Sequence, residues 1–386
     1  MQIIVKLTTE CNLRCVYCSE GDKAPARLPL PLLKKLIDDY PELLDKCDDK
    51  EASLLWHGGE PLLVGKEYLE EAMAYAEEKL KDYNVRFSLQ TNGTLIDDEW
   101  IELFKRHRVG VGVSIDGYKE LHDSKRLDKA GQPTFDRVRD NIRRLREAKV
   151  DGGCLMVWSE PEISDMDKLL ALIQDKDIHL KINPLVACGR AQNDAKAAEI
   201  GKSWAALMKM LMEKAAEENF SISPLEETVQ ALLTGGTLSE CTYNGYCGEK
   251  MLCLFADGTM SFCGRAGGLK DIYGFGNLRD KTLWEMYNSP AAIKIRDRQK
   301  ALRENECREC KEWSLCHGGC SFEAVNANGN LNSRFPGCAA RKEFLTYLKT
   351  EGLSLIKQGL LKEKHYQRTV IKEKERILEE ISHAGK

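Results

Sequence analysis

Cysteine content constrains this chain more than any other feature of its sequence. Fifteen of the 386 residues are cysteine, and most of them fall into two groups. The first group consists of Cys11, Cys15 and Cys18, and the second of Cys241, Cys247, Cys253, Cys263, Cys307, Cys310, Cys316, Cys320 and Cys338. A disulfide framework needs an oxidising compartment, and the chain begins without a secretion signal. We therefore expect the grouped cysteines to bind metal.

The overall composition is that of an ordinary globular protein. The net charge is -4 and the pI is about 6.1, so no basic field favours binding to nucleic acid or to an anionic membrane. No apolar run approaches the roughly 18 residues that span a bilayer. A cytoplasmic location is expected. Three isolated cysteines, Cys47, Cys154 and Cys188, are interpreted as small buried apolar residues.

Short β-rich runs alternate with amphipathic stretches over the first half of the chain. The expected strands are Ile3–Leu7, Ser53–Trp56, Arg86–Gln90, Gly110–Ile115, Leu155–Trp158 and His179–Ile182. Between them, apolar residues recur at helical spacing. Repeated β/α units build a parallel sheet, and six of them are too few to close an eight-unit barrel. The predicted fold class is α/β, a partial (β/α)6 TIM-type barrel with its site at the carboxyl ends of the strands.

The amino-acid composition changes after the predicted barrel. We expect the barrel to cover residues 1–200, a helical segment at 201–239 to bridge two domains, and Ser203–Asn219 to be a helix. A cysteine-rich domain held by metal rather than by an apolar core is predicted at 240–340. Residues 341–386 are strongly charged and predict a helical, solvated tail.

The first cysteine group has a C-x3-C-x2-C spacing in the loop after the first expected strand. Such short spacings let one backbone segment wrap an iron-sulfur cubane, and three thiolates leave one iron open to a small molecule. A zinc site is the alternative, but zinc ligands usually come as two C-x2-C pairs. The spacing therefore favours a cluster with an open iron.

This triplet, with an aromatic residue before its last cysteine, resembles the radical S-adenosylmethionine (SAM) superfamily. Further motifs at strand ends match it: Gly58-Gly59-Glu60-Pro61, Gln90-Thr91-Asn92-Gly93 and Ser114-Ile115-Asp116-Gly117. The resemblance implies that the open iron binds SAM and that reductive cleavage yields a 5′-deoxyadenosyl radical. It also implies SAM contacts by Tyr17, Gly58, Gly59, Glu60, Ser114, Asp116, Arg126 and Leu185. Of these, Arg126 would meet the SAM carboxylate through its guanidinium fork.

The second group contains nine cysteines, enough for two four-ligand sites with one left over. Its C-x2-C-x5-C-x3-C run, from Cys307 to Cys320, resembles the SPASM extension of peptide-modifying radical SAM enzymes. That resemblance implies two auxiliary clusters with interleaved ligands. Cys241, Cys247, Cys263 and Cys320 would hold one, and Cys307, Cys310, Cys316 and Cys338 the other. Cys253 is then surplus, or replaces Cys241.

Nearly the whole chain resembles anaerobic sulfatase-maturating enzymes, which oxidise cysteine or serine to formylglycine. Those enzymes carry an aspartate directly after the last upstream auxiliary cysteine, where this chain has Gly264. Since glycine cannot act as a general base, we expect a relative that forms a thioether or carbon-carbon crosslink in a ribosomally made peptide. We expect no leader-binding domain before the first strand at Ile3. The catalytic acid or base is unassigned; Asp257, Arg265 and Asp271 are interpreted as surface or structural residues.

The expected cofactors are three 4Fe-4S clusters and SAM. The expected partners are a peptide or protein substrate and an electron donor such as flavodoxin or ferredoxin. Two other classes of protein remain as alternatives. A non-enzymatic electron carrier would have no use for the SAM motifs, and a zinc-stabilised binding module would be colourless rather than brown.

Overall fold

A computed structural model describes most of the chain, in two compact units. The described residues are 1–193, 196–218, 220, 222, 223, 225, 227, 228, 231, 238 and 241–357. The first unit consists of Met1–Leu155, Val186–Asn193 and Tyr246–Arg298, and the second of Met156–Leu185, Asp194–Gly245 and Gln299–Lys386. Each unit therefore draws on segments that are far apart in the sequence.

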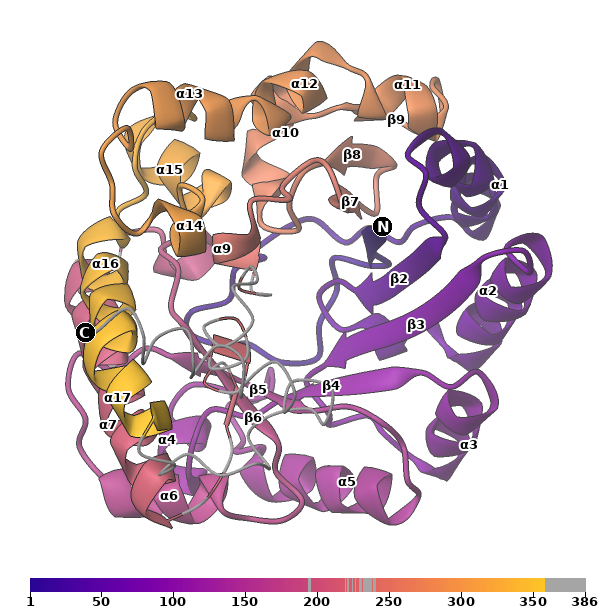
Figure 1. The fold of residues 1–386 in the computed structure, drawn as a ribbon. Coiled ribbons are helices and arrows are strands. Elements are labelled where there is room, and N and C mark those ends of the chain that lie inside the picture. The colour runs from indigo at the N-terminus through magenta and orange to yellow at the C-terminus, as the bar shows by residue number, and fades with distance from the viewer. Residues whose placement is uncertain are drawn as a thin grey trace. The chain divides into compact units, whose positions relative to one another are not determined.

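A sheet forms the centre of the first unit (Figure 1). Its strands are β1 (Gln2–Lys6), β2 (Glu51–His57), β3 (Asn84–Thr91), β4 (Gly110–Ser114), the start of β5 (Cys154–Trp158), β7 (Met251–Leu254), β8 (Thr259–Ser261) and β9 (Gly276–Asn277). They follow the order β5-β4-β3-β2-β1-β7-β8-β9. Neighbours from β5 through β7 are parallel, whereas β8 and β9 pair antiparallel.

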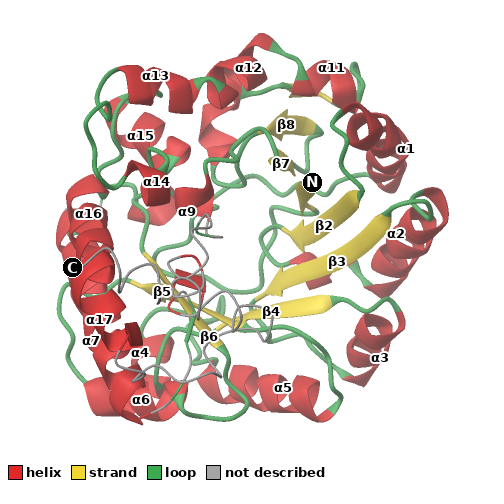
Figure 2. Ribbon diagram, in the orientation of Figure 1, coloured by secondary structure: helices red, strands yellow, loops and turns green. Residues whose placement is uncertain are grey.

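Helices follow the strands of the first unit and lie outside them (Figure 2). They are α1 (Leu30–Lys46), α2 (Lys66–Lys79), α3 (Asp98–Arg106), α4 (Lys119–Asp123), α5 (Phe135–Glu147), α10 (Lys270–Tyr273), α11 (Leu283–Tyr287) and α12 (Pro290–Arg296). The apolar residues of α1 recur at helical spacing and are buried, as in Leu33, Leu36 and Ile37. Asp97 caps α3 by accepting a hydrogen bond from the backbone N–H of Trp100 at 2.9 Å.

Shorter 3-10 turns complete the first unit. They are η1 (Pro61–Val64), η2 (Gly189–Ala191) and η3 (Ala266–Leu269). The strands end at the loops that carry the predicted motifs: β1 leads to the first cysteine triplet and β2 to Gly58-Gly59. Lys6 and His57 stand opposite each other in the register of β1 and β2. Parallel strands thus bring these loops to one edge of the sheet.

The second unit is mostly helical. Its elements are the end of β5, α6 (Met166–Ile173), β6 (Leu180–Pro184), α7 (Ala197–Glu218), α9 (Cys241–Asn244), α13 (Arg298–Glu304), α14 (Trp313–Cys316), α15 (Ser321–Asn328), α16 (Cys338–Tyr347), the π-helical turn η4 (Leu348–Gly352) and α17 (Leu353–Lys357). Helices α7 and α16 pack together. Trp204 of α7 donates from Nε1 to the carbonyl of Ile182 in β6 at 3.1 Å, which fixes the helix to the strand.

The six strands expected in the barrel region are all present, within two residues of their predicted bounds. The sheet is parallel there, and helices follow its strands, so the predicted α/β class is confirmed. The helix expected at Ser203–Asn219 begins earlier, at Ala197. Cys154 and Cys188 are buried, but Cys47 is only half-buried at the end of α1, so the expectation for Cys47 was wrong. Most of the predicted tail lies outside the described residues.

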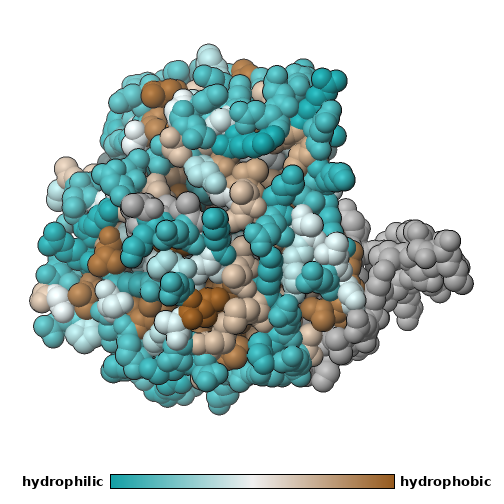
Figure 3. All heavy atoms as spheres, turned by 90° about the vertical axis from the view of Figure 1, so that its left-hand side faces the viewer, coloured by the Kyte–Doolittle hydropathy of each residue, from teal (hydrophilic) through white to brown (hydrophobic). Residues whose placement is uncertain are grey.

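Hydrophilic side chains predominate on the face drawn in Figure 3, and its hydrophobic residues lie in small separate patches. Among the described residues, no helix is long and apolar enough to cross a membrane.

Candidate active site

The loop after β1 carries the first cysteine triplet and is clamped by the end of β2. The backbone N–H of Gly59 donates to the carbonyl of Thr8 at 2.8 Å, and that of Glu60 donates to the carbonyl of Glu10 at 2.8 Å. A Cβ atom on Gly59 would lie 2.2 Å from the Glu10 carbonyl oxygen. Glycine is therefore required at position 59 for the two loops to approach.

The three thiols of the triplet lie near enough to influence one another's ionisation. Burial raises the pKa of Cys11 to about 11, so its thiolate needs a partner that replaces the proton. Two donors face its sulfur: the backbone N–H of Leu13 at 3.4 Å and Nδ2 of Asn92 at 3.8 Å. Hydrogen bonds to sulfur are typical of cluster ligands, so these residues fit an iron-sulfur cluster.

A segment far along the chain packs on the same loop. The backbone N–H of Arg190 donates to the Cys18 carbonyl at 3.0 Å, and its Nη1 donates to the Cys15 carbonyl at 2.9 Å. Gly189, with φ of 57°, leaves no room for a Cβ atom, which would lie 2.2 Å from the Cys18 carbonyl oxygen. Sequence reasoning missed this clamp; the only signal was a Gly-Arg pair soon after the sixth strand.

Glu60 is fully buried below the loop. Its carboxylate accepts hydrogen bonds from Oγ1 of Thr91 at 2.7 Å and from the backbone N–H groups of Asn92 at 2.8 Å and Leu62 at 3.2 Å. Burial raises the pKa of Glu60 to about 7, and the hydrogen bonds oppose that rise. Glu60 therefore links the ends of β2 and β3.

Three of the predicted SAM contacts meet in one buried cluster. Arg126 donates from Nε to Oδ2 of Asp116 at 2.7 Å, and the hydroxyl of Tyr17 hydrogen-bonds to the same oxygen. The guanidinium carbon of Arg126 lies 5.4 Å from the centre of the Tyr17 ring. Burial alone would lower the pKa of Arg126, but the Asp116 carboxylate raises it well above its usual range. The cluster holds a permanent cation beside Cys15.

Two further predicted residues are placed by their hydrogen bonds. The hydroxyl of Ser114, at the end of β4, accepts from Nε2 of Gln90 at 3.0 Å. The backbone N–H of Leu185 is already used, because it donates to the carbonyl of Trp158 at 2.8 Å. Leu185 belongs to the second unit, whereas the Tyr17, Asp116 and Arg126 cluster belongs to the first.

A group of charged residues that sequence reasoning missed lies at the ends of β1 and β2. The ammonium of Lys6 pairs with Oε1 of Glu20 at 2.6 Å and lies 3.3 Å from Nδ1 of His57. Lys23 pairs with the other oxygen of Glu20 at 2.7 Å. Burial raises the pKa of Glu20, but the two lysines lower it to about 2 overall. A charged residue at the end of a buried strand was the available signal.

The same lysine fills the space beside Gly264. A Cβ atom on Gly264 would lie 3.0 Å from Cε and 3.5 Å from Nζ of Lys6. The Lys6 side chain, which extends from β1, therefore lies within contact distance of any side chain at the position after Cys263.

The predicted ligands of the first auxiliary cluster are divided between the units. Cys247 and Cys263 belong to the first unit, and Cys241 and Cys320 to the second. Cys253 is fully buried on β7, paired in register with Ile4 of β1, and burial raises the pKa of its thiol. Its surroundings are those of a core thiol.

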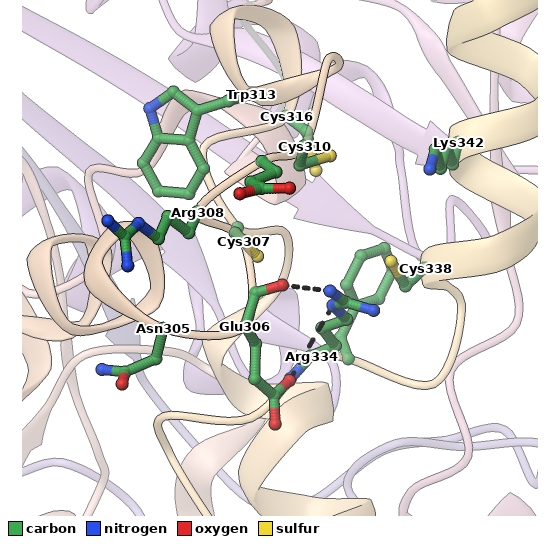
Figure 4. Close-up of a pocket in the computed structure, with 13 residues that line it drawn as sticks. Asn305, Glu306, Cys307, Arg308, Cys310, Trp313, Cys316, Arg334, Cys338 and Lys342 are labelled. Carbon is green, nitrogen blue, oxygen red and sulfur yellow. Dashed lines mark hydrogen bonds and ion pairs between the residues drawn. The ribbon is translucent and has the colours of Figure 1, made fainter.

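Within the second unit, the four predicted ligands of the other auxiliary cluster line one cavity of about 430 Å³ (Figure 4). They are Cys307, Cys310, Cys316 and Cys338. Burial and, to a smaller extent, the other three thiols raise the pKa of Cys316 to about 11. Arg334 closes one side through its ion pair with Glu306. A cavity with four converging thiols fits a cubane.

Among the described residues, no group of three His, Cys, Asp or Glu side chains is close enough to hold a single metal ion. A cubane is a different case, because each of its cysteines binds a different iron atom.

The cysteine segments of the second unit are tied together by polar contacts. His317, next to Cys316, lies with Nδ1 2.7 Å from the carbonyl of Tyr243. Arg341, on the helix that begins at Cys338, donates to the Tyr243 hydroxyl at 2.9 Å and stacks on Trp204 at 3.9 Å. These contacts tie the segments that carry Cys316 and Cys338 to Tyr243 and Trp204.

Comparisons with known proteins agree with this architecture. Residues 5–173 match the family model of the radical SAM superfamily, and residues 241–311 match that of the SPASM iron-sulfur cluster-binding domain. The chain therefore contains a radical SAM domain and a SPASM domain. Both domains imply iron-sulfur clusters, and the first implies SAM.

Several anaerobic sulfatase-maturating enzymes are among the proteins that this chain resembles. The cysteine-type enzyme of Clostridium novyi is 26% identical over 361 residues, which cover 89% of this chain and 93% of the relative. Among solved structures, native anSMEcpe with bound AdoMet has a TM-score of 0.78 at 24% identity, covering 92% of this chain and 98% of that one. SuiB of Streptococcus suis, bound to the precursor peptide SuiA, has a TM-score of 0.63 at 16% identity, covering 87% and 75%. The structural similarities show the fold.

Proposed function

We propose that this radical SAM enzyme oxidises a ribosomally made peptide and leaves a thioether or carbon-carbon crosslink in it. SAM, when bound, would supply a 5′-deoxyadenosyl radical that abstracts a hydrogen atom from the peptide. The observation that carries the proposal is that Gly264 has no side chain and that the ammonium of Lys6 lies beside it. A protonated amine there cannot take a proton from the substrate.

The residues that would bind SAM are those of the first unit. Within the described part of the chain, the two terminal nitrogens of Arg126 make no hydrogen bond. Neither nitrogen is one of the buried polar atoms that are cut off from solvent. The Asp116 contact uses only Nε, so the fork remains able to bind the SAM carboxylate. Tyr17, Ser114 and the backbone at Gly58-Gly59 would complete the site, and Cys11, Cys15 and Cys18 would hold its cluster.

Two auxiliary clusters are proposed as electron acceptors for the oxidation. The cavity that contains Cys307, Cys310, Cys316 and Cys338 supports one of them, and the second would require Cys241, Cys247, Cys263 and Cys320. The first cavity is also lined by Arg308 and Lys342. Glu306 and Glu309 line it as well, so the charges around this cavity are mixed.

A peptide substrate is supported by two neighbours of this fold. SuiB is solved with a precursor peptide, and anSMEcpe with the Kp18Cys peptide. Formation of formylglycine in a sulfatase remains the second candidate, because several relatives that span most of the chain are sulfatase-maturating enzymes.

The mass and reactivity of the product separate the two candidates. The reconstituted enzyme would be incubated anaerobically with SAM, a reductant and either the peptide encoded beside it or a sulfatase-derived cysteine peptide. A crosslink removes two hydrogen atoms and leaves no aldehyde, whereas the aldehyde of formylglycine reacts with a hydrazine probe. A hydrazine-reactive product from the sulfatase peptide would overturn the crosslink proposal.

A further inference from the structure

His57 is the last residue of β2 and directly precedes the two glycines proposed to meet SAM. Its side chain is half-buried, and its two ring nitrogens have different surroundings. Nδ1 lies 2.7 Å from the backbone nitrogen of Gly58 and 3.3 Å from the ammonium of Lys6. Both of these groups carry protons.

These neighbours fix the tautomer of the ring. A proton on Nδ1 would face an N–H group and a cation, while only the Gly58 carbonyl, at 3.2 Å, would accept it. Glu20 pairs with Lys6 at 2.6 Å and keeps the ammonium in place. Nδ1 therefore accepts hydrogen bonds, and the ring proton resides on Nε2. Burial and the Lys6 charge lower the pKa of His57 to about 3, in agreement with a neutral ring.

The other ring nitrogen of His57, Nε2, lies on the opposite side of the imidazole. Among the described residues, Nε2 of His57 has no hydrogen-bond partner, and it is not one of the buried polar atoms cut off from solvent. The ring thus has one N–H group at the carboxyl end of the strand that is available to a ligand. In parallel α/β sheets, this is the edge where ligands bind.

His57 lies between the proposed SAM contact and the segment of the proposed cluster ligand Cys263, both of which belong to the first unit. On one side, Gly58 and Gly59 begin the proposed SAM contact. On the other, Lys6 connects His57 to Gly264, which follows the proposed cluster ligand Cys263. A peptide that is attacked by a SAM-derived radical and then oxidised by an auxiliary cluster has to lie near both.

We propose that Nε2–H of His57 donates a hydrogen bond to a carbonyl oxygen of the bound peptide and so positions the attacked residue. This inference rests on the proposed function, because it requires a peptide substrate. Lys6 and Glu20 act through the ring: their charges hold the tautomer that makes His57 a donor. His57 is thus a positioning residue and not a base.

The test compares His57→Gln with His57→Leu. Glutamine can accept from Lys6 through its amide oxygen and donate through its amide nitrogen, whereas leucine can do neither. The matched control is His179→Leu, since His179 is exposed in the second unit. Each protein is reconstituted anaerobically, its iron content is measured, and KM and kcat are determined with the peptide that the wild-type enzyme modifies.

We expect His57→Leu to raise the KM for the peptide about fivefold to tenfold, because one hydrogen bond to the peptide is lost. The KM for SAM should change less. His57→Gln should recover most of the affinity, and His179→Leu should match wild type. An unchanged peptide KM in His57→Leu overturns the inference. A rise confined to the KM for SAM also overturns it, because the acceptor would then be the SAM carboxylate. If the wild-type enzyme cleaves SAM but modifies no peptide, the proposed function is wrong, and the inference about His57 is wrong with it.

Discussion

Asp116 and Arg126 form an ion pair that is almost sealed from solvent, with Nε 2.7 Å from Oδ2 and the two side chains 1% and 9% exposed. Removing one charge of a buried pair leaves the other uncompensated, which typically costs about 3 to 5 kcal/mol. Asp116→Asn keeps an oxygen for Nε but removes the charge. We expect it to lower the free energy of unfolding by about 3 kcal/mol in anaerobic urea titrations.

Asp136→Asn is the matched control for that experiment. Asp136 pairs with Lys119 on the surface, where both side chains are more than half exposed. Exposed pairs contribute at most about 1 kcal/mol. Equal losses of unfolding free energy in the two variants would show that the buried Asp116 pair stabilises the fold no more than an exposed pair does.

The raised pKa of Glu60 predicts a pH-dependent stability. Between its ordinary value of 4.5 and its folded value of about 7, the folded protein binds a proton that the unfolded chain has released. Stability therefore falls as the pH rises through this window and levels off above it. Glu60→Gln cannot titrate. We expect wild type to lose about 3 kcal/mol relative to Glu60→Gln between pH 5 and pH 8 in urea unfolding. Parallel pH profiles would contradict the raised pKa.

Iron content distinguishes ligand cysteines from core cysteines. Cys316 lines the cavity with three other thiols, whereas Cys253 is fully buried in the sheet. Cys316→Ala should lower the iron bound after reconstitution by about four atoms per chain, the content of one cubane. Cys253→Ala should keep the wild-type amount. A loss of iron in Cys253→Ala would make that cysteine a ligand.

Position 264 offers a test of the missing carboxylate. A side chain there would touch Lys6, so the carboxylate of Gly264→Asp is expected to pair with the ammonium instead of accepting a substrate proton. Gly264→Ala adds the same Cβ atom without the charge and measures the crowding alone. We expect neither variant to form a hydrazine-reactive peptide. An aldehyde product from Gly264→Asp alone would show that Lys6 does not neutralise the new group.

The sequence was sufficient for the strands and for the cysteine motifs because both are local. Strand periodicity and turn residues predicted β1 to β6 closely, and the C-x2-C-x5-C-x3-C run predicted cysteines that line one cavity. Patterns of this kind depend on neighbours along the chain.

The contacts that sequence reasoning missed join residues distant in the chain. Gly189 and Arg190 pack on the loop of Cys15 and Cys18, about 170 residues away. Lys6 lies inside the predicted strand Ile3–Leu7, and nothing in the sequence places it beside Gly264. Cys47 was assigned to the interior by residue type alone, although the end of α1 leaves it half-buried. Only the fold brings these groups together.

The central claim is that a radical derived from SAM takes hydrogen from a peptide. The most direct measurement uses a peptide carrying deuterium on carbon at the modified residue, incubated anaerobically with the enzyme, SAM and a reductant. Mass spectrometry then follows deuterium into 5′-deoxyadenosine. The account predicts deuterium-labelled 5′-deoxyadenosine together with a peptide that has lost two hydrogens. Unlabelled 5′-deoxyadenosine with an unchanged peptide would contradict it.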